Sequence, residues 1–339
     1  MDTADRPEAE RQAPERHVVG ILVGDEESMP PGLETVADMA DVRLVRGDVG
    51  LVETLREAEV LCVWDFRRQR LEQAWPEAQK LRWVHAASAG VDAVNIPPLV
   101  ESDVVVTNTR GVLDDAIAEW VLAVMLLFVK DLDGTLRLQR RHDWQHRNTE
   151  RLAGRRVLVV GAGSVGRAVA ALCRAAGMRV DGVARTSRPP DGDFESVVGA
   201  DGLAEALSGA EFVVLCVPLT VETHGMIGAA ELAALPHGAR LVNVSRGPVV
   251  DEAALLDALR TGRLGGAALD VFEQEPLPPE HPFWEMPQVI VSPHMAGDFV
   301  GWEEAFSEVF LENFRRWQRG EPLANVVDKG QLMAPVSRP

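Results

Sequence analysis

Short apolar runs alternate with longer segments that carry one apolar face along most of the chain. An apolar run, an amphipathic segment and another apolar run are typical of a strand, a crossover helix and a parallel strand. In the first third of the chain this pattern predicts strands at Val18–Val23, Val42–Val45, Val60–Trp64, Arg82–His85 and Val104–Thr107. We therefore expect a mostly parallel sheet with helices on its faces.

A second series of the same kind begins after Gly154. Its first strand, Arg156–Val160, leads into a glycine-rich turn and an alanine-rich helix that ends near Ala176. Further strands are expected at Met178–Val183, Phe212–Val217, Arg240–Val244, Gly266–Asp270 and Val289–Ser292. The fold class predicted is α/β, with two doubly wound parallel-sheet domains.

The two series predict two domains. Residues 17–110 form the first, residues 111–299 form the second, and the last helix returns the chain to the first domain over residues 300–328. The apolar helix Ala116–Val129 joins them, and the cleft between them is the expected active site. Residues 1–16 and 329–339 are predicted to be flexible tails, because they contain too little apolar surface to pack.

Composition narrows the classes of function. The formal net charge is −18, from 52 acidic and 34 basic residues, which disfavours nucleic acid and membrane as partners. Cys62, Cys173 and Cys216 are scattered among apolar neighbours, with neither disulfide nor metal-ligand spacing. We expect buried thiols in a reducing cytoplasm and no metal site. The longest apolar run, Trp120–Val129, is too short to cross a bilayer.

The turn after Val160 reads Gly161-Ala-Gly163-Ser164-Val165-Gly166. In a G-x-G-x-x-G turn the first glycine permits the tight bend and the second lets a pyrophosphate approach the backbone. The third glycine lets helix and strand pack closely, and the helix N-terminus faces the phosphate charge. The strand before this turn and the helix after it supply the context that dinucleotide binding requires. Pro218, directly after the strand Phe212–Val217, is a further expected cofactor residue.

The end of the next strand bears on which dinucleotide binds. Asp181 lies inside the run Met178–Val183, too early to meet a ribose 2′-hydroxyl. Ala184 stands at the strand end and is followed by Arg185-Thr186-Ser187-Arg188. Two arginines and two hydroxyls suit a 2′-phosphate, which favours NADP over NAD. The alternative is a solvated basic turn.

Three later segments contain the residue types that hydride transfer to a keto acid requires. Arg246 follows an apolar strand and can bind a carboxylate and polarise a keto oxygen, unless it is only a surface arginine. Asp270 and Glu275 lie at and just past the next strand end, and His294 ends the last strand. A histidine paired with a carboxylate is a proton donor. A lone histidine is more often structural, so the catalytic role predicted for His294 depends on its occurrence together with Arg246 and Glu275.

A small-residue turn, Ser88-Ala89-Gly90, ends a strand of the first domain. Its backbone N–H groups can hold a substrate carboxylate. An ordinary tight turn explains the same residues equally well.

In this order, the segments resemble those of the D-isomer-specific 2-hydroxyacid dehydrogenases. The resemblance covers about residues 18–328. It rests on Ser88-Ala-Gly90-Val-Asp92, Gly161–Gly166, Arg246-Gly247, Asp270–Pro276 and Pro293-His294. It implies a Rossmann-like nucleotide domain inserted in a flavodoxin-like substrate domain, and hydride transfer between a nicotinamide cofactor and a 2-keto or 2-hydroxy acid.

The resemblance also implies a role for each residue. Arg246 binds and polarises the keto acid, and His294 is the general acid or base. Glu275 keeps His294 protonated, and Asp270 holds the nicotinamide carboxamide. The Ser88, Ala89 and Gly90 amides take the substrate carboxylate.

Within that family the chain is most similar to glyoxylate/hydroxypyruvate reductases. The likeness rests on the run from Arg246 to Asp251, on Val63-Trp64, and on the Arg185–Arg188 turn, which accompanies NADP use in that group. Trp64 is then expected to line the substrate pocket, with simple core packing as the alternative. Family members are usually dimers through the linking helix and the segment after it, where Trp144 is placed to reach a partner's site.

Two other functions are compatible with the same motifs. A non-catalytic NAD(P)(H)-sensing corepressor has the same fold, although the complete Arg–Glu–His set argues against it. A phosphite or formate dehydrogenase of this fold is the other, and a pocket with room for a carbon chain separates it from the main prediction. The length of the substrate chain is not readable from the sequence.

Overall fold

The computed structural model describes residues 16–65 and 68–331 and divides into two compact units. The first unit takes the described residues of Met1–Thr109 and Glu303–Ala334, and the second comprises Arg110–Trp302. Most of both predicted tails lies outside the described residues. Lys329 is an exception, because its Nζ donates to the carbonyl oxygens of Leu99 and Ser102 at 2.9 and 2.6 Å.

The first unit contains a five-stranded parallel sheet in the order β2-β1-β3-β4-β5. This 2-1-3-4-5 order is that of flavodoxin-like folds. The strands are β1 (Val18–Leu22), β2 (Asp41–Val45), β3 (Val60–Val63), β4 (Trp83–Ala86) and β5 (Val105–Asn108). Each coincides with a predicted run to within two residues. Such apolar runs form strands that are buried on both faces of a parallel sheet.

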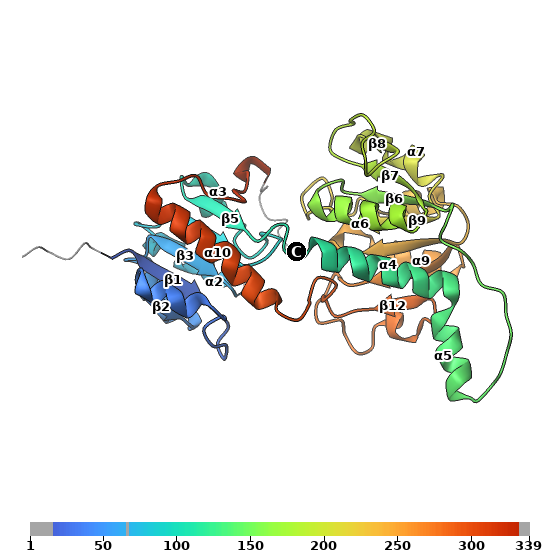
Figure 1. Cartoon of the computed structure of the whole chain (residues 1–339), viewed down its shortest axis with the longest axis horizontal. Coiled ribbons are helices and arrows are strands. Elements are labelled where there is room, and N and C mark those ends of the chain that lie inside the picture. The colour runs from blue at the N-terminus through green and yellow to red at the C-terminus, as the bar shows by residue number, and fades with distance from the viewer. Residues whose placement is uncertain (1–15, 66–67, 332–339) are drawn as a thin grey trace, which may run out of the picture. The chain divides into compact units, whose positions relative to one another are not determined.

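The connections in the first unit are short helices, as parallel strands require. They are η1 (Leu33–Asp38), α1 (Gly47–Leu55), α2 (Arg68–Ala74), η2 (Trp75–Glu77), α3 (Pro97–Glu101) and, near the chain end, η6 (Lys329–Gln331). The long helix α10 (Trp302–Arg319) lies alongside this sheet (Figure 1). Its Phe310 stacks on Trp83 with ring centres 5.3 Å apart, so α10 closes the core of the unit.

The second unit contains a seven-stranded parallel sheet in the order β12-β11-β10-β9-β6-β7-β8. Its strands are β6 (Arg156–Val160), β7 (Arg179–Val183), β8 (Ser196–Val198), β9 (Phe212–Leu215), β10 (Ala239–Asn243), β11 (Leu264–Leu269) and β12 (Val289–Val291). Counted from β6 this is the 3-2-1-4-5-6 order of dinucleotide-binding folds with one strand added. The order reverses between β6 and β9, and ligands of such sheets bind at the carboxyl ends beside that point.

Helices cover both faces of the second sheet. They are α4 (Asp114–Lys130), α5 (Leu132–Arg140), α6 (Ser164–Ala175), α7 (Leu203–Leu207), α8 (Ala229–Ala234) and α9 (Glu252–Arg260), with the short helices η3 (Ala200–Gly202), η4 (Gly247–Val249) and η5 (Pro282–Glu285). Figure 1 shows α4 and α6 side by side. Neighbouring residues of one strand serve opposite cores, since Val214 packs under α4 and α6 while Val213 packs on the other face.

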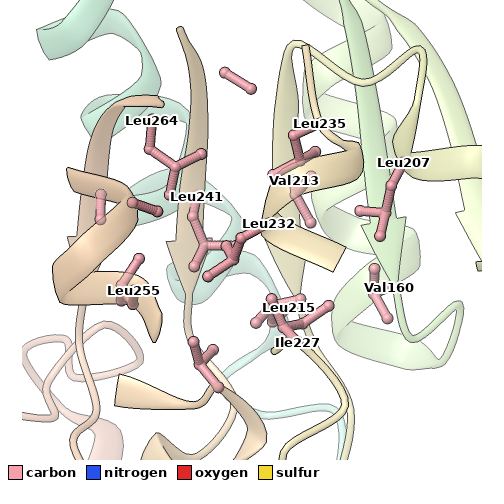
Figure 2. Packing of buried hydrophobic residues seen from close by; sticks show 14 of the residues in the cluster. Val160, Leu207, Val213, Leu215, Ile227, Leu232, Leu235, Leu241, Leu255 and Leu264 are labelled. Atoms are coloured by element: carbon pink, nitrogen blue, oxygen red, sulfur yellow. The ribbon is translucent and has the colours of Figure 1, made fainter. Parts of the chain in front are cut away.

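The core on that other face joins the sheet to α7, α8 and α9. Figure 2 shows Leu207, Leu232 and Leu255 from these helices packed toward Val213 and Leu241 of the sheet. Leu241 is fully buried. This packing fixes the strand ends from which the candidate residues project.

The helix predicted around Ala116–Val129 is α4, and it belongs to the second unit. It stops at Asp131, whose φ of 45° is left-handed, and the Asp131 side chain accepts from the Gly134 N–H to begin α5. Among the described residues, none of the helices combines the length and apolar character that a membrane span requires.

Candidate active site

The glycine-rich turn lies between β6 and α6, at the point where the strand order reverses. Gly161 has a φ of 105°, and a Cβ there would lie 2.6 Å from the Cys216 carbonyl oxygen after β9. A Cβ on Gly166 would lie 2.0 Å from the Gly161 carbonyl oxygen. The first and third glycines are therefore required by the fold itself.

Gly163 differs from its two partners, because a Cβ at this position would meet no described atom within 4 Å. Gly163 is the N-cap of α6, with Ser164 and Val165 in the first turn. Open space in front of a twelve-residue helix N-terminus is what a diphosphate group requires. The turn thus fits the dinucleotide that its sequence predicts.

The end of β7 has the composition expected from the sequence. Asp181 lies within the strand and accepts from Ser196 Oγ at 2.6 Å, so its carboxylate is engaged inside the sheet. Beyond Ala184, residues Arg185 to Ser187 are exposed. Arg188 is half-buried, and its Nη2 donates to the Ala162 carbonyl oxygen at 3.1 Å. The arginine turn therefore lies directly beside the glycine-rich turn.

The loop after β9 begins at Pro218. The Thr223 hydroxyl donates to the Pro218 carbonyl oxygen at 2.6 Å, and the Thr220 N–H donates to Thr223 Oγ1 at 2.8 Å. In this loop, hydrogen bonds from Thr220 and from its own N–H lower the pKa of Glu222, and the nearby Arg185 lowers it further. The charge of Arg185, in the arginine turn, therefore lies near the Pro218 loop.

His294 and Glu275 form a hydrogen-bonded pair. His294 follows β12 with a left-handed φ of 57°, and its Nδ1 lies 2.8 Å from Glu275 Oε2. The second oxygen, Glu275 Oε1, accepts from the Phe272 N–H at 3.0 Å. Both side chains stay partly exposed, so the imidazole can reach a ligand.

Burial acts to raise the pKa of Glu275, but its contacts outweigh that effect and hold the pKa below the usual value. These contacts are the hydrogen bonds from His294 and the Phe272 N–H, with the charges of His294 and Arg246. Glu275 is therefore an anion beside the imidazole at neutral pH.

Asp270, the residue after β11, is buried and accepts three hydrogen bonds. Its Oδ1 accepts from Ser292 Oγ at 2.6 Å and from the Met295 N–H at 2.9 Å, while Oδ2 accepts from the Ala296 N–H at 2.9 Å. All three donors flank His294. In this structure Asp270 thus anchors the turn that presents the histidine.

Arg246 follows β10, and its Nη1 donates to the Ser245 carbonyl oxygen at 2.7 Å. The next residue, Gly247, lies against the neighbouring loop so closely that a Cβ would be 1.9 Å from the Phe272 carbonyl carbon. This contact holds Arg246 close to the Glu275 loop. The fold therefore brings Arg246, Glu275 and His294 to one sheet edge from three adjacent strands.

The remaining candidates belong to the first unit. Ser88 Oγ donates to the Gly90 carbonyl at 2.6 Å, and the Asn108 amide donates to the Ala89 carbonyl at 2.7 Å, which fixes this turn. Trp64 is only 6% exposed and packs edge-on against Phe306 of α10, 6.2 Å between ring centres. This contact agrees with the packing alternative for Trp64.

Two charged residues near the turn were not predicted from the sequence. Arg167, directly after the last glycine of the motif, pairs with Asp191 and Asp193. Asp114, the first residue of α4, interacts with Ser164. The position of Arg167 after the motif is a signal that sequence could have used, whereas the Asp114 contact depends on how α4 packs on α6.

A glycine-rich diphosphate turn, with an arginine and a histidine–carboxylate pair on the same sheet edge, defines a nicotinamide-dependent oxidoreductase. Residues 122–296 match the NAD binding domain of the D-isomer specific 2-hydroxyacid dehydrogenases. The glyoxylate reductase of Korarchaeum cryptofilum is 34% identical over 268 residues, which are 76% of this chain and 79% of that protein.

Two solved structures are similar over nearly the whole chain. One is a D-isomer specific 2-hydroxyacid dehydrogenase from Xanthobacter autotrophicus Py2 with NADPH and MES, at 33% identity and TM-score 0.77, covering 94% of this chain and 100% of that one. The other is an NADPH-dependent glyoxylate/hydroxypyruvate reductase from Sinorhizobium meliloti with NADP and sulfate, at 29% identity, TM-score 0.77 and the same coverage.

This chain belongs to the D-isomer specific 2-hydroxyacid dehydrogenase family. It is an NAD(P)-dependent oxidoreductase that acts on CH–OH donors and reduces 2-keto acids. The predicted family, fold class and enzyme class are confirmed.

Proposed function

We propose that the enzyme is an NADPH-preferring reductase of small 2-keto acids such as glyoxylate and hydroxypyruvate, with His294 as its proton donor. The hydrogen bond of 2.8 Å between His294 Nδ1 and Glu275 carries this proposal. The names of the reductases from Korarchaeum cryptofilum and Sinorhizobium meliloti support the substrate class. The Arg185–Arg188 turn supports the preference for NADPH.

In the proposed mechanism Arg246, Glu275 and His294 have different roles. Arg246 binds the carboxylate and polarises the keto oxygen. Glu275 accepts from Nδ1 of the imidazolium, so Nε2 carries the proton that is delivered to that oxygen. A bound reduced nicotinamide supplies the hydride to the keto carbon. The neutral imidazole then regains its proton from solvent.

The other candidates bind and orient in this proposal. The turn Gly161, Gly163 and Gly166 takes the diphosphate together with the first turn of α6, and Arg185 to Arg188 take the 2′-phosphate. Asp270 accepts the nicotinamide carboxamide while it anchors the His294 turn. The Ser88–Gly90 amides of the first unit take the substrate carboxylate, and Trp64 lines the pocket.

The first test follows the loss of reduced-nicotinamide absorbance with NADPH and NADH in parallel. Glyoxylate, hydroxypyruvate, pyruvate and bulkier 2-keto acids are the substrates. We expect turnover of the small acids with NADPH and a kcat/KM at least about tenfold lower with NADH. Equal use of both cofactors contradicts the NADPH preference, and preference for bulky acids contradicts the substrate class.

The second test replaces His294 with alanine. Loss of the proton donor should lower kcat about 100-fold or more while NADPH still binds, measured by stopped-flow turnover and calorimetric titration. His281→Ala is the matched control, because His281 is also paired with a glutamate, Glu252, at 2.9 Å. Full turnover by His294→Ala contradicts the assignment.

We also propose that the enzyme is a cytoplasmic homodimer. Apolar side chains exposed on α4 and α5, with Trp144 beyond them, support the dimer. The three cysteines are free, which supports a reducing compartment. Enzyme activity in the soluble fraction of cells, with all three thiols titratable after denaturation, tests the location.

A further inference from the structure

Three contacts hold the Arg188 guanidinium beside the glycine-rich turn. Its Nη2 donates to the Ala162 carbonyl oxygen at 3.1 Å, and its plane lies over the Phe194 ring with 5.8 Å to the ring centre. Its Nε lies 3.9 Å from Asp191 Oδ2. In the described part of the chain, this buried Nε makes no hydrogen bond. Arg188 is therefore fixed in place without using all its donors.

Arg167 of α6 also reaches Asp191, and it pairs with Asp193 as well. Its Nη2 lies 2.9 Å from Asp191 Oδ2, and its Nη1 pairs with Asp193. Its guanidinium carbon lies 6.0 Å from the centre of the buried Phe194 ring. The ring is thus close to both guanidinium groups, and Asp191 is shared by both.

Asp191 and Asp193 lie beside the arginines, close to the place proposed for the 2′-phosphate. Hydrogen bonding from the Asp193 N–H lowers the pKa of Asp191, against a smaller opposing effect of burial, and the Phe194 N–H and Arg167 lower it further. Asp191 Oδ1 accepts from those two N–H groups at 2.9 and 3.1 Å, so the turn aims Oδ2 at the arginines. Unneutralised, both carboxylates would repel a phosphate.

We propose that Arg167 is a positioning residue for cofactor selection, which neutralises Asp191 and Asp193 so that Arg188 keeps its charge for the 2′-phosphate of NADPH. The inference rests on the NADPH preference proposed above. Arg167 then acts through Asp191 and Arg188 rather than by touching the phosphate.

The test measures dissociation constants of NADPH and NADH by calorimetry for the full-length enzyme. We expect Arg167→Gln to weaken NADPH about tenfold or more and NADH by less than about threefold, since only NADPH carries the phosphate that two unpaired carboxylates repel. Adding Asp193→Asn to Arg167→Gln removes one of these charges and should restore much of the NADPH affinity. Arg174→Gln, on an exposed position of the same helix, is the control and should change neither constant.

Equal weakening of both cofactors by Arg167→Gln overturns the inference, because a general attraction for the diphosphate or a loss of structure acts on both. Failure of Asp193→Asn to restore NADPH binding also overturns it.

Should Arg167→Gln not fold, the single variant Asp193→Asn decides instead. We then expect a lower dissociation constant for NADPH and an unchanged one for NADH. A wild-type enzyme that binds both cofactors equally refutes the proposed preference as well. A wild-type preference lost in the Arg185/Arg188 double variant but kept in Arg167→Gln refutes only the role of Arg167.

Discussion

At the scale of single residues, the pKa values of two carboxyl groups in the second unit are shifted in opposite directions, for different physical reasons. Hydrogen bonds and nearby positive charge hold the pKa of Glu275 down despite burial. Burial and the neighbouring charge of Asp115 raise the pKa of Asp114, and its interactions with Ser164, Arg110 and the Gly111 N–H only partly offset these effects. One Asp114 oxygen, Oδ1, is buried without a hydrogen-bond partner among the described residues. The surroundings of Glu275 therefore stabilise its charged form, whereas those of Asp114 destabilise its charged form.

A stability measurement tests whether the charged Asp114 carboxylate destabilises the fold. In the folded enzyme the pKa of Asp114 lies above its ordinary value of 3.8. The protonated carboxyl therefore stabilises the fold below pH 3.8, and this stabilisation is lost as the pH rises through the folded pKa. Asp114→Asn should therefore raise the Tm of the free enzyme by about 1–3 °C at pH 7–8, with little difference near pH 4. Scanning calorimetry at both pH values checks this, with Glu119→Gln, at an exposed position of the same helix, as control. A lower Tm at pH 8 contradicts the prediction.

At the scale of elements, the ends of parallel strands bring distant residues to one edge. Arg246, Glu275 and His294 follow β10, β11 and β12, which are neighbours in the sheet. Within the glycine-rich turn the three glycines have different duties, since Gly161 and Gly166 meet backbone atoms and Gly163 faces open space.

Substituting two of these glycines separates folding from binding. In Gly166→Ala the new Cβ clashes with the Gly161 carbonyl, so we expect a loss of about 2 kcal/mol or more in unfolding free energy. In Gly163→Ala the Cβ occupies space left for the diphosphate, so Tm should stay within about 2 °C while NADPH binds about tenfold or more weakly. Thermal unfolding and calorimetric titration check both variants. Unchanged NADPH affinity in Gly163→Ala would show that the diphosphate does not lie there.

Most strands were predictable because their buried runs are largely apolar, and the parallel sheets follow from the alternation of these runs with helices. Glu275 and His294 were predictable because each belongs to a motif that follows a strand end, Asp270–Pro276 after β11 and Pro293-His294 after β12. The strand β8 was missed because Ser196–Val198 is too short to give a pattern. The cluster of Arg167, Asp191 and Arg188 was missed for another reason: its contacts join a helix to a loop, and no spacing in the sequence encodes them.

At the scale of the whole molecule, a net charge of −18 must coexist with an anionic cofactor and an anionic substrate. The second unit resolves this conflict locally, with Arg185 and Arg188 beside the glycine-rich turn and Arg246 beside His294. The excess of negative charge over the molecule as a whole does not favour self-association. The proposed dimer must therefore depend on apolar contact.

One group of exposed apolar side chains of the second unit lies on and near α5. Leu132 and Leu136 are 45% and 48% exposed, Trp144 is fully exposed, and Trp284 is half-exposed. Trp284 lines a cavity of about 480 Å³ with Phe128 and Arg137 from the α4–α5 region. Figure 1 shows α5 and the loop after it projecting from the body of the second unit, as an element does that packs on another chain. Exposed apolar side chains gathered in this way support the proposed dimer interface.

Replacing Leu132 and Leu136 with glutamate places two charges in this surface. If it is the dimer interface, burying them is costly, and the double variant should be a monomer of 36.9 kDa where the wild type is twice that mass. Light scattering after size exclusion gives the mass. Val49→Glu, an equally apolar and more exposed position in the first unit, is the control and should remain dimeric. A double variant that keeps the dimer mass excludes this surface as the dimer interface.

Trp144→Ala removes a side chain that is proposed to reach the partner's site. This variant should keep the dimer mass and raise the substrate KM, so that assembly and catalysis are measured separately.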